Sequence, residues 1–153
     1  MQTGTIRLRE LTVRYAVKKD VQGQPVIIGR AVSGPKDCAE ALISLLQDEP
    51  TEVFAMLCLT TKHRVIAYHE VSRGQLDSTI VHPREVFKVA VLANAAAIVV
   101  CHCHPSGDPA PSTEDLSVTR RLAAAGQIMG ITVLDHIIIG DGRYYSFKES
   151  GHV

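Results

Sequence analysis

Residues 101–115 read CHCHPSGDPAPSTED, and this stretch decides how the rest of the chain is interpreted. The apolar run that leads into it predicts a core strand over residues 96–103, which ends in His102 and His104. Side chains two residues apart in a strand point to the same face and are about 6.6–7 Å apart, so both imidazoles can converge on one ion. The spacing therefore predicts two metal ligands at the end of a strand.

The second half of the stretch predicts a loop followed by a helix. Three prolines and Gly107 interrupt regular structure, and Ser112 precedes an apolar-periodic run over residues 116–129. Asp115 is then expected in the first helical turn. Ser112 and Asp115 are also typical of a capping box, and helix caps are commoner than metal sites. The two interpretations are compatible, because Ser112 can cap the helix while its hydroxyl faces a metal-bound water.

Two histidines and one carboxylate supply three protein ligands, and a catalytic zinc keeps its fourth position for water. Zinc lowers the pKa of that water towards ~7 and polarises a substrate carbonyl, but a nearby carboxylate must accept the proton. Three glutamates are candidates: Glu52 at the start of an expected core strand, Glu70 near the end of the next strand, and Glu85 in the helix after it. Spacing along the sequence does not choose among them.

The long spaced motif resembles a known family. His102-x-His104, Pro-Ser-Gly and Ser112-x-x-Asp115, with seven residues between His104 and Ser112, resemble the JAMM (MPN-plus) zinc metalloprotease signature. Within that superfamily, the segments VHPREVF, HPSGDPAPS and LDHIIIGDGRYYSF are similar to the bacterial RadC-like domain over about residues 35–150. That family usually has Asn where this chain has Cys103. Because this strand residue faces away from the metal, we expect the change to alter packing more than ligation.

The resemblance implies a Zn²⁺ cofactor on His102, His104 and Asp115. It also implies a catalytic glutamate where the first helix is followed by a strand, and the family pattern Glu-x-Phe matches EVF at residues 52–54, which favours Glu52. The implied activity is that of a metallopeptidase or isopeptidase acting on a peptide or protein. Glu52 would take the proton of the metal-bound water and pass it to the leaving amine, and Ser112 would help to stabilise the oxyanion.

The whole chain predicts an α/β fold with a mixed central sheet flanked by helices, which agrees with the JAB/MPN (cytidine-deaminase-like) architecture that the resemblance implies. We expect a short N-terminal β-hairpin arm over residues 1–32, with strands at 5–18 and 25–28, and one domain over residues 33–153. Helices are expected over residues 35–49, over 83–94, and from Ser112 to Gly126 or Gly130. Further strands are expected over residues 51–60, 64–71, 74–81, 96–103, 131–140 and 143–147.

Two side-chain expectations follow from these elements. In the helix over residues 83–94, Phe87, Val91 and Leu92 are expected to form the buried stripe. In the strand over residues 131–140, His136 is expected to be a core histidine or one that supports a ligand, because the metal already has three protein ligands.

Composition favours a single globular domain in the cytoplasm. A chain of 153 residues can bury about two-thirds of its unfolded surface. Its formal net charge is zero, so no overall electrostatic attraction draws it to nucleic acid or to a membrane. Its apolar runs are too short to span a bilayer, and the N-terminal residues carry no apolar leader. The four cysteines are expected to be buried, reduced thiols.

Other functions are less consistent with the motifs. A zinc nucleobase deaminase needs H-x-E with P-C-x-x-C, and both patterns are missing from the sequence. A Cys/His zinc knuckle is disfavoured, because the cysteines and histidines of CHCH alternate between two strand faces. The alternative class is a RadC-type, DNA-repair-associated accessory or binding module without robust peptidase activity. The arm has five basic residues and two acidic ones over residues 5–20, but no aromatic ladder, which favours a solvated strand over direct nucleic-acid binding.

Overall fold

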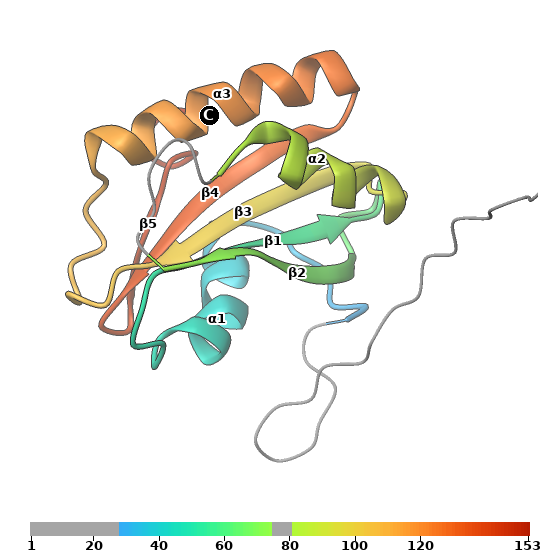
Figure 1. Cartoon of the computed structure of the whole chain (residues 1–153). Coiled ribbons are helices and arrows are strands. Elements are labelled where there is room, and N and C mark those ends of the chain that lie inside the picture. The colour runs from blue at the N-terminus through green and yellow to red at the C-terminus, as the bar shows by residue number, and fades with distance from the viewer. Residues whose placement is uncertain (1–27, 75–80) are drawn as a thin grey trace, which may run out of the picture.

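The computed structural model describes residues 28–74 and 81–153 (Figure 1). The strand expected at 5–18, most of its expected partner at 25–28, and most of the short strand expected at 74–81 lie outside these residues. The described part confirms an α/β fold in which three helices flank one mixed sheet. No helix in the described ranges combines the length and the apolar character needed to cross a bilayer.

Five strands form the sheet in the order β2-β1-β3-β4-β5. Their bounds are Val53–Leu59 for β1, Val65–Arg73 for β2, Ala97–Cys103 for β3, Thr132–Gly140 for β4 and Arg143–Ser146 for β5. β1 is antiparallel to β2 and to β3, and β4 is antiparallel to β5. β3 and β4 are parallel, so the chain must cross over between them, and it does so through α3 (Thr113–Met129). The crossover begins at the carboxyl end of β3.

The helices cover both faces of the sheet. α1 (Pro35–Leu46) lies on one face, while α2 (Pro83–Leu92) and α3 lie on the other (Figure 1). Every residue of β1 and β3 is buried, which explains why both strands are apolar on both faces, with His102 of β3 as the exception, rather than alternating. A separate apolar cluster therefore fills each side of the sheet.

The buried stripe expected for α2 is partly wrong. Phe87 is buried as expected, but Val91 and Leu92 are 49% and 36% exposed. The helix instead contacts the core through Val86, Phe87 and Ala90. This helix is apolar over more than one face, so its tilt against the sheet and α3 decides which apolar residues are covered.

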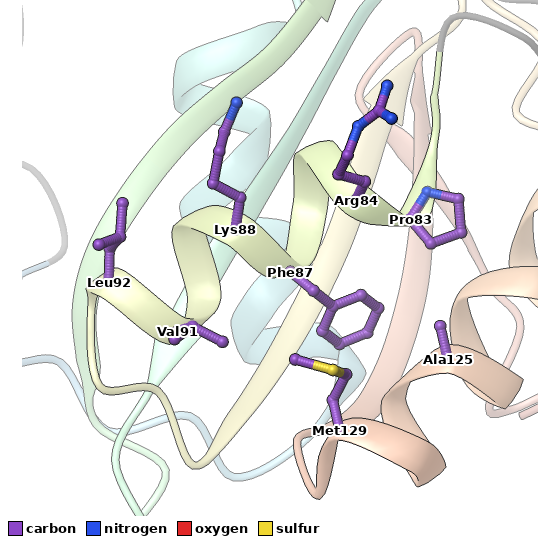
Figure 2. A pocket seen from close by; sticks show the side chains of 8 residues that line it. All are labelled: Pro83, Arg84, Phe87, Lys88, Val91, Leu92, Ala125 and Met129. Atoms are coloured by element: carbon purple, nitrogen blue, oxygen red, sulfur yellow. The ribbon is translucent and has the colours of Figure 1, made fainter.

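The exposed apolar side chains of α2 line a groove between α2 and α3 (Figure 2). Its volume is about 690 Å³, and Ala125 and Met129 of α3 form the opposite wall. Figure 2 shows Phe87 and Met129 pointing toward each other between the two helices. Val91 and Leu92, which were expected to be buried, line this groove instead.

Two glycines show how α3 ends and how tightly it packs. Gly130 closes the helix in the left-handed conformation, with φ of 67°, so the later of the two expected ends is confirmed. Gly126 stays inside the helix. A Cβ atom there would lie 2.6 Å from the carbonyl oxygen of Ile131, so the end of the helix packs closely against the chain that enters β4.

The loop after β3 is packed against the β4–β5 hairpin. The amide of His104 donates to the carbonyl oxygen of Ile139 at 2.8 Å, and the Arg143 guanidinium donates to the carbonyl oxygen of Gly107 at 3.1 Å. A Cβ atom on Gly140 would lie 2.7 Å from that same Gly107 oxygen, so only glycine allows this approach. The loop that follows the two histidines is thereby fixed to the sheet.

Candidate metal centre

His102 and His104 converge at the carboxyl end of β3. His102 is 1% exposed, and its Nε2 atom lies 2.9 Å from Nε2 of His104, the residue directly after the strand. Their ring centroids are 4.8 Å apart. The expectation that both imidazoles share one strand face and can reach one ion is therefore consistent with the geometry.

Asp115 is brought to the same point by the start of α3. The Ser112 hydroxyl accepts from the Asp115 amide at 3.1 Å, and Asp115 Oδ2 accepts from the Ser112 amide at 2.8 Å, which completes the expected capping box. The cap orients the carboxylate so that Oδ1 lies 3.1 Å from His102 Nε2 and Oδ2 lies 3.5 Å from His104 Nε2. One residue thus acts as helix cap and as candidate ligand.

These three residues form a group that could hold a metal ion. One donor atom from each of His102, His104 and Asp115 lies within 4.8 Å of the other two. His104 Nδ1 lies 2.8 Å from the carbonyl oxygen of Asp108, which can only accept, so Nδ1 carries the proton and Nε2 presents a lone pair. Nitrogen and oxygen donors of this kind suit zinc and other divalent first-row metals.

Charge at the group follows from its hydrogen bonds. Burial alone would raise the pKa of Asp115, but hydrogen bonds with His102 and His104, in the forms that carry a hydrogen on Nε2, outweigh burial and hold that pKa well below its usual range. The hydrogen bond with Asp115 raises the pKa of His104 above 6.5, against the opposing effect of burial. A carboxylate facing two imidazoles therefore favours positive charge at this point, whether from a proton or from a metal ion.

Glu52 lies immediately before β1. Phe54 of β1 pairs with His102 of β3, so Glu52 comes two residues before the point where β1 meets the end of β3. The side chain of Glu52 is partly buried, and its charge contributes to raising the pKa of His104. The structure therefore brings Glu52 close enough to act electrostatically on a candidate ligand.

The other two glutamates lie elsewhere and make surface ion pairs. Glu70 lies on β2, which β1 separates from β3, and pairs with Arg73 at 2.8 Å. Glu85 lies in the first turn of α2, as expected, and pairs with Lys88 at 2.6 Å.

Cys103 faces away from the metal group, as expected. It packs with Cys101 in the apolar cluster on the α1 side of the sheet, and its thiol approaches the carbonyl oxygen of Thr51 at 3.5 Å. All four cysteines are free and buried. Within the described residues, the candidate metal group contains histidine and aspartate only.

Two buried residues, His136 and Thr119, form hydrogen bonds that lead to His102, and the sequence predicted only His136. His136 is fully buried and its Nε2 lies 2.8 Å from Nδ1 of His102, so it contacts a ligand as expected. Thr119, which sequence reasoning missed, lies 2.6 Å from His136 Nδ1. Its position four residues after Asp115 was the available signal, because residues four apart share one helix face.

A polar cleft of about 590 Å³ opens beside His104. Its walls come from the end of α1, the loop after β3 and the β4–β5 turn, and the residues are 47–49, 104–108, Asp141 and Arg143. Ser112 is exposed, and because its oxygen accepts the Asp115 amide, its hydroxyl hydrogen can be donated outward. Of the three residues of the group, His104 lines the cleft, so the cleft reaches the group at His104.

Comparison with known proteins gives consistent matches. The family model of the RadC-like JAB domain matches residues 32–152. A UPF0758 protein of Alkaliphilus oremlandii is 52% identical over 118 residues, which are 77% of this chain and 51% of that protein. A UPF0758 protein of Desulfitobacterium hafniense is 44% identical over 149 residues, 97% of this chain and 65% of the relative. A UPF0758 protein of Bacillus cereus is 50% identical over 123 residues, which are 80% of this chain and 55% of that protein. The matched region thus spans between about half and two-thirds of each of these relatives.

Proposed function

Because the chain belongs to the family of RadC-like JAB domains, we propose that it is a zinc-dependent hydrolase that cleaves an amide bond in a peptide or protein, as a metallopeptidase or an isopeptidase. The observation that carries the proposal is the convergence of His102, His104 and Asp115 on one point, with a polar cleft that His104 lines beside it. Three protein ligands leave a fourth position for water, which is the arrangement of hydrolytic zinc sites rather than structural ones.

The donor set fits zinc. The Nε2 atoms of His102 and His104 lie 2.9 Å apart, and so short an approach is favourable when a hydrogen or a metal cation is shared by the two nitrogens. Asp115 offers Oδ1, while its Oδ2 is held by the Ser112 amide, so it would act as a ligand through one oxygen. When bound there, zinc supplies a water of lowered pKa and a Lewis acid for the substrate carbonyl.

Two side chains would perform the proton transfer and the charge stabilisation. Glu52, whose charge acts on His104, would accept the proton of the attacking water and deliver it to the leaving amine. The Ser112 hydroxyl would donate a hydrogen bond to the oxyanion of the tetrahedral intermediate. The cleft beside His104 would hold the substrate chain.

The alternative is a binding module in DNA repair. The charged side chains of the cleft argue against a nucleic-acid phosphate at this site, because Asp48, Glu49, Asp108 and Asp141 are acidic and Arg143 is basic. A role elsewhere on the chain would require duplex DNA binding that weakens steeply with salt.

The proposal is tested by metal analysis and by digestion of a peptide library. We expect about one zinc per chain, lost in His104→Ala, and cleavage that a chelator abolishes. Glu52→Gln should keep its zinc but lose cleavage by about 100-fold or more, because only the general base is removed. Glu85→Gln is the matched control and should cleave normally.

Negligible metal in both the unaltered chain and His104→Ala would overturn the proposal. Zinc without cleavage of the library, together with salt-sensitive DNA binding in a gel-shift assay, would favour the binding module instead.

A further inference from the structure

We propose that Thr119 and His136 are positioning residues that hold His102 in the tautomer whose Nε2 lone pair faces the metal. The inference rests on the proposed metal site and goes beyond it, because it assigns a positioning role to two buried residues that would contact neither the metal nor the substrate. The geometry that carries it is a continuous chain of hydrogen bonds from the backbone of α3 to His102.

The direction of this chain is fixed at its start. Thr119 Oγ1 lies 2.7 Å from the carbonyl oxygen of Asp115 and 2.6 Å from His136 Nδ1. A carbonyl oxygen can only accept, so the single hydroxyl hydrogen of Thr119 goes to Asp115. His136 Nδ1 must then be the donor to Thr119 Oγ1.

The next steps follow from the chemistry of neutral imidazole. A neutral His136 with hydrogen on Nδ1 has only a lone pair on Nε2. His102 Nδ1, 2.8 Å away, must therefore donate its hydrogen to His136 Nε2. His102 is left with a lone pair on Nε2, the atom that faces His104 and Asp115.

The opposite direction leaves one contact without a hydrogen. If Thr119 donated to His136, its oxygen and the carbonyl oxygen of Asp115 would face each other at 2.7 Å as two acceptors. Asp115, Thr119 and His136 are buried, so bulk water is not at hand to repair the mismatch. The cost of this acceptor–acceptor contact thus opposes the reverse direction, which Asp115 Oδ1 would otherwise favour by accepting a hydrogen from His102 Nε2 at 3.1 Å, and it favours the direction that prepares His102 for a metal.

Aromatic stacking keeps both rings in the plane that the chain needs. Phe54 stacks on His102 with centroids 5.9 Å apart and an interplanar angle of 16°. Phe147 stacks on His136 with centroids 4.7 Å apart and an angle of 10°. Rotation of either ring would break the hydrogen bond between them, so packing and hydrogen bonding both oppose that rotation.

The test compares Thr119→Val, which removes the hydroxyl at nearly constant shape, with Thr119→Ser, which keeps it. Nitrogen NMR of histidine-labelled full chain reads the tautomer of His102 directly, in metal-free protein above pH 8 and in zinc-loaded protein. Competition with a chromophoric chelator gives the zinc affinity. We expect the hydrogen of His102 on Nδ1 in the unaltered chain and in Thr119→Ser. In metal-free Thr119→Val we expect a tautomer mixture, with zinc affinity about 10–100-fold weaker.

An unchanged tautomer and affinity in Thr119→Val would overturn the inference, and so would equal losses in Thr119→Val and Thr119→Ser, which would indicate packing alone. If Thr119→Val does not fold, Thr119→Ala removes the same hydroxyl without filling the space and is read in the same way. Failure of the metal site itself gives a different result, because the unaltered chain would then bind no zinc.

Discussion

The two faces of β3 differ in chemistry although they alternate residue by residue. His102 points to the side of α2 and α3, where it meets His104, Asp115 and His136 through polar contacts. Its neighbours Cys101 and Cys103 point to the α1 side, into an apolar cluster. Both faces are buried, so burial alone does not make a functional site.

The difference lies in the partners that each face supplies. On the α1 side, burial raises the pKa of the Cys101 and Cys103 thiols, and these residues behave as small apolar side chains. Thiolates are the form that binds metal, so these cysteines are poor ligands although they flank a metal group. On the other side, hydrogen bonds hold the imidazoles with lone pairs directed outward. Polar partners, more than residue type, separate the two faces.

The largest effect on zinc affinity is expected when His102, on the polar face of β3, is replaced. His102→Gln keeps a polar side chain but removes the ligand and the contact with His136. Zinc affinity should fall by more than the about 100-fold typical of losing a supporting residue. Cys103→Ala is the matched change on the opposite face and should retain one zinc per chain by metal analysis. Loss of zinc in Cys103→Ala would contradict the assignment of the faces.

The dependence of zinc affinity on pH sharpens the same contrast. The pKa of His104 is raised above 6.5, so its bound proton competes with zinc up to a higher pH than at an ordinary histidine. Affinity should rise about tenfold per pH unit below that pKa and then level off. Chelator competition between pH 6 and pH 9.5 measures this profile. A further rise near pH 9 would reveal a thiolate ligand and would contradict the inert role of Cys103, whose pKa lies above 9.0.

The smallest effect is expected on the apolar face. Cys101 is fully buried beside α1, and Cys101→Ala should lower the free energy of unfolding by about 1 kcal/mol, because a small cavity replaces the sulfur. Urea unfolding of the metal-free chain measures this loss, and zinc affinity should stay unchanged. A weaker zinc site in this variant would show that the two faces are coupled through the strand.

Local patterns were enough to predict much of the candidate site. The two histidines share a face because a strand has a period of two, and Asp115 enters the site because helix starts have a recognisable sequence. The exposure of Val91 and Leu92 was not predictable in the same way, and for the contact of Thr119 with His136 the sequence offered only the spacing of Thr119 from Asp115. Both depend on how a helix is placed against the sheet, which local sequence does not encode. The electrostatic effect of Glu52 on His104 likewise depends on the pairing of β1 with β3, which brings distant parts of the sequence together.

The capping box of α3 also has an evolutionary consequence. The carboxylate of Asp115 closes the first helical turn as well as facing the imidazoles, so deleting it would cost about 1 kcal/mol of stability even in a chain that has given up its metal. A descendant that lost the metal group but kept its fold would be under pressure to retain another side chain that accepts the Ser112 amide, such as Glu or Gln. Residue 115 would then remain a helix-capping residue, and its position would still mark where the candidate metal ligand had been.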